Sequence, residues 1–250
     1  DGLELNLAGN AGDMLGADPS VAVDGNLHAN LDTLSRLVPD TLGVNLEGRL
    51  DADIKGTARL SQLSMYNFSS ADLQGLLTGK GIVLTMPSDT IDVRINSLDI
   101  RLGPEEIASR RDSSKSFRLM GITGEIAKAD ISYKDAMKLK VSDFRVAAKN
   151  MIDPKTSADT TKRIYPFGGS ISAGKLSFRD SEGTSIRVEN TKNGFQILPK
   201  KGQPMVPMLT LNSRNGKIAL KSGVNRALIT DADISASAAM NTVERRKKMK

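Results

Sequence analysis

The 250-residue chain contains no cysteine, no tryptophan and a single histidine, His28. Without cysteine it can form neither a disulfide framework nor a thiolate metal site. Nucleophilic catalysis by a hydroxyl needs a base within reach, and His28 lies in a strand-like segment where a surface position is expected. The stretch from Gly75 to Gly81 partly resembles a phosphate-binding loop, but it lacks the required spacing and the Ser or Thr after the lysine. We expect a turn there, and we predict that the chain is not an enzyme and uses no cofactor or metal.

Two carboxylates, Asp51 and Asp53, would lie about 7 Å apart on one face of a strand. Such a pair could serve glycoside hydrolysis or calcium binding. Because Arg49, Lys55 and Arg59 share that face, we interpret it as mixed charge on the solvated side of a sheet. A polysaccharide-active enzyme built on stacked strands stays open as the enzyme alternative, and turnover of a glycan would reveal it.

Long apolar runs are also missing. No run approaches the 18 or so residues of a spanning helix, and the N-terminus lacks the pattern of a signal peptide. The chain begins at Asp1, directly in an alternating segment, so we infer a piece of a longer protein whose targeting and anchoring segments lie outside it. The net charge of +6 gathers in a basic tail at residues 241–250 and in a few loops. With aromatics at only 4%, base stacking has little support, and we predict no nucleic-acid partner.

What the sequence does contain is alternation, most clearly in residues 44–60. Apolar and small side chains occupy every second position there, and charged or polar side chains occupy the positions between them. A period of two indicates an extended strand, because a helix would scatter the apolar residues around its circumference. Seventeen residues would reach about 55 Å, so either the strand is very long or Gly48 or Gly56 bends it.

Similar alternation separated by turn residues recurs along the whole chain, which predicts one β-rich region over residues 1–250. The fold class is mainly β, an elongated and largely antiparallel sheet with one short amphipathic helix at residues 31–38, capped by Asn30 and ended by Pro39. The sequence Asp24-Gly25 suggests a hairpin or bulge. The alternation slips at Asn96-Ser97, which predicts a β-bulge. Residues 151–169 are expected to form a long loop.

Residues 30–103 resemble the AsmA-like envelope bridge proteins, a family that includes the TamB translocation and assembly proteins, and are most similar in style to Bacteroidetes members. The similarity is carried by LDTLSRLVPD (Leu31 to Asp40), VNLEGRLDADIKGTARL (Val44 to Leu60), ADLQGLL (Ala71 to Leu77) and DTIDVRINSLDIRLG (Asp89 to Gly103). The resemblance implies a periplasmic protein anchored to the inner membrane, with an incompletely closed β-sheet tube or groove whose apolar concave face holds lipid acyl chains.

Together, the alternation and the resemblance lead us to expect a groove module for phospholipid or other lipid transfer between the inner and outer membranes. The alternatives are a scaffold for outer-membrane protein assembly that works by strand addition, and a purely structural spacer with a filled core. The helix at residues 31–38 would lie at one mouth of the groove. The residues expected to line the lipid-binding groove are Val44, Leu46, Leu50, Ile54, Leu60, Ile91, Val93 and Ile95.

Overall fold

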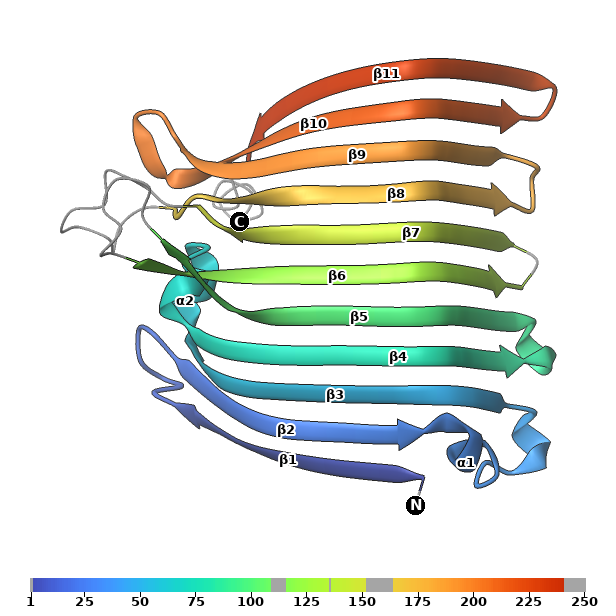
Figure 1. Cartoon of the computed structure of the whole chain (residues 1–250), viewed down its shortest axis with the longest axis horizontal. Coiled ribbons are helices and arrows are strands. Elements are labelled where there is room, and N and C mark those ends of the chain that lie inside the picture. Colours follow the sequence, from blue (N-terminus) through green and yellow to red (C-terminus); the bar gives the residue numbers. More distant parts are fainter. Residues whose placement is uncertain (1, 109–115, 135, 152–163, 241–250) are drawn as a thin grey trace, which may run out of the picture.

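A computed structural model describes residues 2–108, 116–134, 136–151 and 164–240 of the chain. It shows one antiparallel sheet of eleven strands, whose order across the sheet is the order along the chain (Figure 1). The sheet does not close into a barrel, since β1 and β11 lie at opposite edges. The predicted mainly β, open and antiparallel architecture is therefore confirmed.

The strands are long, which follows from the length of the alternating segments in the sequence. Their bounds are β1 (Leu3–Gly12), β2 (Ser20–Asn30), β3 (Asn45–Arg59), β4 (Asp72–Met86), β5 (Ile91–Ala108), β6 (Ser116–Tyr133), β7 (Met137–Asn150), β8 (Phe167–Asp180), β9 (Ser185–Lys200), β10 (Gln203–Ser222) and β11 (Asn225–Ala239).

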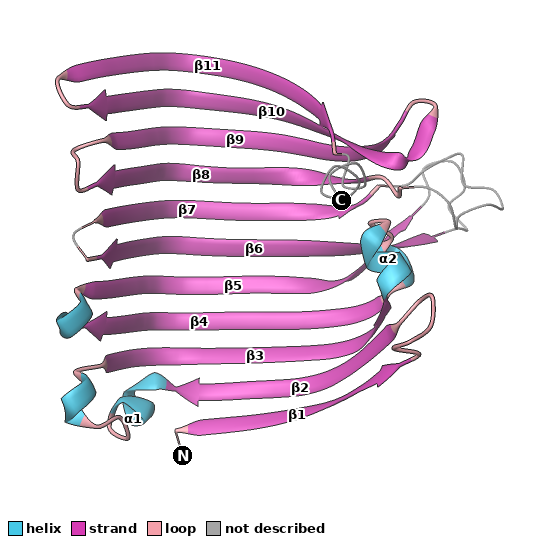
Figure 2. Ribbon diagram, turned by 180° about the vertical axis from the view of Figure 1, so that it is seen from behind, coloured by secondary structure: helices cyan, strands magenta, loops and turns pink. Residues whose placement is uncertain are grey.

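Two short α-helices, rather than the expected one, lie at opposite ends of the sheet (Figures 1 and 2). Helix α1 (Leu31–Ser35) is capped as predicted, because the backbone N–H of Thr33 donates to the Asn30 side chain at 3.1 Å, but it ends three residues before Val38. Helix α2 (Leu60–Ser64) follows β3 directly. The described residues also form three 3-10 turns: η1 (Asp40–Leu42), η2 (Phe68–Ser70) and η3 (Pro87–Asp89).

One face of the sheet is apolar across all eleven strands, because side chains directly opposite each other in paired strands share a face. Leu50, for example, pairs with Ala29 on one side and Gly79 on the other. We call this the apolar face and its reverse the charged face. The apolar face includes Leu5 and Leu7, Val23 and Leu27, Leu50 and Ile54, Leu77 and Leu84, Val93 and Ile100, Ile122 and Ile131, Leu139 and Val146, Ile171 and Leu176, Val188 and Phe195, Leu211 and Ile218, and Ile229 and Ile234.

The apolar face stays continuous because the alternation of side chains shifts by one residue in the strands from β4 to β11, at the same level of each strand. The pairing on both sides skips Asn96, where a bulge was predicted. In β4, a Cβ placed on Gly79 would lie 2.5 Å from Cδ1 of Ile82, although residues three apart point to opposite faces in a regular strand. Asp143, Asn190 and Asp231 take positive φ values of 51°, 52° and 52° at the same level of later strands. Apolar residues before and after this line therefore share one face.

Two predicted turns are wrong. Asp24-Gly25 lies in the middle of β2, and Gly75 lies within β4. Each segment is paired on both sides, and the hydrogen bonds of two neighbouring strands outweigh a local turn preference. Part of the loop predicted at residues 151–169 is also strand, since β8 begins at Phe167. Residues 152–163 and the basic tail at 241–250 lie outside the described residues.

Candidate functional site

The largest candidate binding surface is the apolar face itself. Its side chains are largely exposed on the edge strands, where Leu7 is 70% exposed and Ile234 is 49% exposed. On the strands between the edges they are mostly half-buried, with Ile54 at 43% exposed. A contiguous apolar patch of this kind is unusual on a monomeric soluble protein and marks an interaction surface. The sheet has no second layer over this region among the described residues, since no other sheet and no long helix is found there.

One end of the apolar face is covered. The connection between β3 and β4, which holds α2 and η2 and which we call the cap segment (residues 60–70), folds over this end (Figure 2). Asn150, which continues the apolar face at the end of β7, is 2% exposed. Its side chain accepts from the backbone N–H of Ser69 at 2.8 Å and donates to the Tyr66 carbonyl at 2.7 Å. Beneath the same segment, Met120 is 2% exposed, and its N–H donates to the Ser69 hydroxyl at 2.8 Å.

Aromatic rings join the cap segment to the sheet. The Phe68 ring lies edge-on to that of Phe167, with centroids 5.2 Å apart, and Phe167 in turn lies 6.0 Å from Phe195. Edge-to-face pairs of this kind add to the stabilisation that burial of the rings provides. The covered end therefore has the packing of a small closed core, whereas the rest of the apolar face does not.

The charged face carries paired ions of both signs. Directly opposed residues form several of the pairs, such as Lys55 with Asp24 at 3.1 Å and Arg145 with Glu125 at 3.0 Å. Burial opposes ionisation of Asp130, but hydrogen bonds from Lys140 and Lys128 outweigh it and lower the pKa of that carboxyl. Because charges of opposite sign neutralise each other locally, this face is suited to contact with water rather than to one anionic partner.

The lone histidine lies on this charged face, at a surface position as expected. Nδ1 of His28 is 2.9 Å from Oδ1 of Asp51, and both side chains are exposed. The hydrogen bond with Asp51 raises the pKa of His28. Asp51 is thus occupied by an ion pair instead of facing Asp53 across a shared ligand, and the described residues contain no group of three or more His, Cys, Asp or Glu that could hold a metal ion.

Most of the residues predicted to line the groove lie together on the apolar face. Leu46, Leu50 and Ile54 come from β3, and Ile91, Val93 and Ile95 come from β5; pairing through β4 places them on the same side. Val44 immediately precedes β3. The structure corrects the strand assignment of Leu60, which begins α2 and lies in the cap segment.

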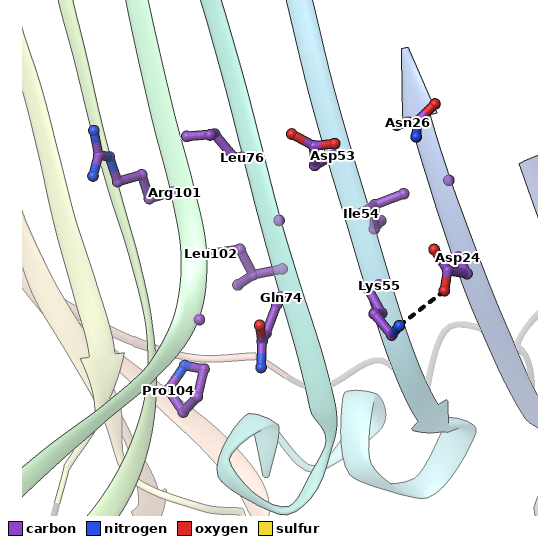
Figure 3. Close-up of a pocket in the computed structure, with 13 residues that line it drawn as sticks. Asp24, Asn26, Asp53, Ile54, Lys55, Gln74, Leu76, Arg101, Leu102 and Pro104 are labelled. Atoms are coloured by element: carbon purple, nitrogen blue, oxygen red, sulfur yellow. Dashed lines mark ion pairs between the residues drawn. The ribbon is translucent and has the colours of Figure 1, made fainter. Parts of the chain in front are cut away.

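An open hollow of about 730 Å³ crosses β2 to β5 (Figure 3). Ile54 is one of the residues that line it, and it pairs with Gly25 on one side and Gly75 on the other, so it stands between two residues without side chains. The Lys55–Asp24 ion pair also borders the hollow.

No protein-family model, curated protein or solved structure matches this chain. The physical properties of the site are therefore the basis for assigning a role. No helix in the described part of the chain is long and apolar enough to cross a membrane. What the apolar face offers chemically is the burial of an apolar ligand or partner.

Sequence reasoning missed two features of this surface. The first is the cap segment, although Leu63, Met65 and Phe68 could have indicated a segment that packs against the sheet. The second is a group of polar residues on β9 and β10. There, the alternating positions that elsewhere carry Ile, Leu or Val carry Asn, Ser and Thr, and this break in the pattern is visible in the sequence.

Proposed function

We propose that the apolar face binds lipid acyl chains and that the chain is a groove module for transfer of phospholipid or other lipids. The observation that carries the proposal is the continuity of the apolar face across eleven strands, together with its exposure outside the covered end. The resemblance of residues 30–103 to the AsmA-like family adds the expectation of a periplasmic location, an inner-membrane anchor and transfer towards the outer membrane.

Binding of the acyl chains would rest on the hydrophobic effect. Burial of each acyl methylene contributes about 0.8 kcal/mol, so even part of an acyl chain laid along the face would be held. The lining is mostly aliphatic, with few side chains that could fix a chain at one point. A surface of this kind has no single position of tight binding, so an acyl chain can slide along it. This property suits transfer more than storage.

The proposal is tested by mass spectrometry of an organic extract from the purified protein, with a similarly purified unrelated protein for comparison. We expect near-stoichiometric lipid, either phospholipid or another acyl lipid, with this protein only. In the Ile54→Asp variant we expect lipid retention to fall at least tenfold, because a charge would lie in the middle of the apolar face. Since Ile54 is partly exposed already, circular dichroism should show unchanged β content.

The matched control is Thr57→Asp, which adds the same charge to the charged face of β3. It should retain as much lipid as the unmodified protein. Absence of enriched lipid from the unmodified protein would contradict the proposal. Loss of β content in Ile54→Asp would instead indicate that this part of the face is a closed core.

A scaffold for outer-membrane protein assembly is the second candidate, favoured by the two sheet edges. Among the described residues, β1 pairs only with β2 and β11 only with β10. An edge strand offers unpaired N–H and C=O groups to which an extended polypeptide can add. Preferential binding of an extended peptide over acyl-chain ligands would favour this function over lipid transfer.

A further inference from the structure

The apolar face carries one cluster of polar side chains that the cap segment does not explain. It consists of Thr191 and Asn193 on β9 and Ser213 and Asn215 on β10, which we call the polar cluster. Cross-strand pairing places Asn193 opposite Ser213 and Thr191 opposite Asn215, so the four side chains form a two-by-two block. The other described polar residues on the apolar face of the strands lie at strand ends: Tyr133 on β6, Asn150 on β7, which binds the cap segment, Asp180 on β8, and the paired Ser222 and Asn225 on β10 and β11.

Apolar residues surround the polar cluster. On β8 the paired residues are Ala173 and Ile171, and on β11 they are Ala232 and Ile234. Along β9, roughly 13 Å of strand separates Asn193 from Ile197, and Phe195 lies between them on the same face. A ligand with its polar group at the cluster could therefore extend apolar parts along the sheet.

Three members of the polar cluster are buried: Thr191 is 4% exposed, Asn215 is 7% exposed and Ser213 is 9% exposed. Their mutual hydrogen bonds use only part of their capacity. Asn193 donates to the Thr191 hydroxyl at 3.0 Å, and Asn215 donates to the Ser213 hydroxyl at 2.9 Å. Within the described part of the chain, neither asparagine amide oxygen accepts a hydrogen bond from a side chain or backbone group.

Because both amide oxygens still reach solvent, a ligand that excludes water from the cluster is favoured when its own polar groups take up this unused capacity. The hydroxyls of Thr191 and Ser213 can donate, and the amide oxygens of Asn193 and Asn215 can accept. No cation from the described residues accompanies them, because the basic neighbours in sequence, such as Lys192 and Arg214, alternate onto the charged face. The cluster therefore suits a neutral polar group with both acceptors and a donor, and it provides nothing to neutralise a phosphate.

We propose that the polar cluster binds the ester and hydroxyl groups of a neutral glyceride while the apolar face holds its acyl chains. A diacylglycerol has two ester carbonyls that can accept from the hydroxyls of Thr191 and Ser213. Its one free hydroxyl can donate to an asparagine amide oxygen. This inference rests on the proposed lipid-binding function and specifies the class of lipid and its position.

The test uses two probes. N-phenyl-1-naphthylamine, an apolar fluorophore without an ester, reports binding anywhere on the apolar face. Dioctanoylglycerol, a short diacylglycerol, is then added to displace it. The test variant is Ser213→Ala with Asn215→Leu, which removes both partners of one hydrogen bond; such paired replacement is expected to leave stability unchanged or higher.

We expect the fluorophore to bind the double variant as it binds the unmodified protein, whereas about tenfold more dioctanoylglycerol should be needed for displacement. The matched control is Asn212→Leu with Ser235→Ala, a hydrogen-bonded pair at 2.8 Å on the charged face. It should behave as the unmodified protein does in both measurements.

Equal displacement by dioctanoylglycerol in the double variant and the unmodified protein would overturn the glyceride site while leaving lipid binding intact. A fall in thermal stability of the double variant without a change in displacement would assign the cluster a structural role instead. Failure of the fluorophore to bind the unmodified protein would overturn the proposed function itself, and the glyceride site with it.

Discussion

The covered end of the apolar face and the rest of that face are lined by the same kinds of side chain, but they differ in what lies over them. Beneath the cap segment, Met120 and Asn150 are almost fully buried, whereas Leu7 and Ile54 on the open part remain largely or partly exposed. One alternating pattern thus gives a closed core where a connection folds back, and an open surface elsewhere. Apolar alternation predicts which face turns from water, but it does not predict whether the protein itself provides the cover.

The two parts also differ in the range of the contacts that hold them. On the open part, the hydrogen bonds that define the sheet join neighbouring strands only. At the covered end, the bonds from Asn150 to Ser69 and Tyr66 join residues more than 80 positions apart. We therefore expect the covered end to depend on tertiary packing and the open part to depend on strand pairing.

The largest expected difference comes from one acidic substitution made in each part. Met120→Asp would bury a carboxylate beneath the cap segment and should lower the free energy of unfolding by about 4 kcal/mol or more. Ile54→Asp should lower it by about 1 kcal/mol or less, because that side chain already reaches water. Urea denaturation followed by circular dichroism measures both. Similar losses in the two variants would show that the open part is a core as well.

A smaller difference is expected from removing one asparagine. Asn150→Ala would leave the Ser69 N–H and the Tyr66 carbonyl without their buried partner, and should lower the free energy of unfolding by about 2 to 3 kcal/mol. The control is Asn6→Ala, which removes an exposed hydrogen bond to Asn26 on β1 and β2 and should change stability by about 0.5 kcal/mol or less. A loss below about 1 kcal/mol for Asn150→Ala would mean that the cap segment is held by its aromatic contacts alone.

The smallest effect concerns the charged face of the open part. Because Asp51 raises the pKa of His28 above the ordinary value of 6.5, the stability that this pair contributes is fully present below pH 6.5. It is lost as the pH rises through the folded-state pKa. The NMR titration of this single histidine should give a pKa above 6.5 that falls in Asp51→Asn. In Asp24→Asn, which removes the partner of Lys55, the pKa should stay near that of the unmodified protein. A wild-type pKa at or below 6.5 would contradict the pairing.

Much of the fold could be predicted from the sequence, because period-two alternation is a property of each strand by itself. Residues 45–59 form one strand of the predicted kind, and the phase slip at Asn96 coincides with an interruption of the pairing on both sides. Six of the eight predicted groove residues also lie on one face, since alternation within β3 and β5 fixes their side once the strands are paired.

The errors arise where distant segments decide the local structure. Asp24-Gly25 and Gly75 carry turn residues, but pairing with strands on both sides holds them extended. Leu60 continues the apolar alternation of β3 and nevertheless starts a helix, whose following residues pack over β7 and β8. Such contacts join segments far apart in the chain, and a single sequence does not record which distant segment each will meet.

The nearest-neighbour order of the strands makes the width of the sheet adjustable. Because each strand pairs only with those beside it along the chain, duplication of a hairpin would widen the apolar face by two strands without rerouting any other connection. The common level at which the alternation shifts restricts such growth. A hairpin added on the β11 side would need its own change of phase at the level of Asp231, or it would turn half of its apolar side chains to the wrong face. The size of the surface can thus change in steps of one hairpin, while the level at which the alternation shifts stays fixed.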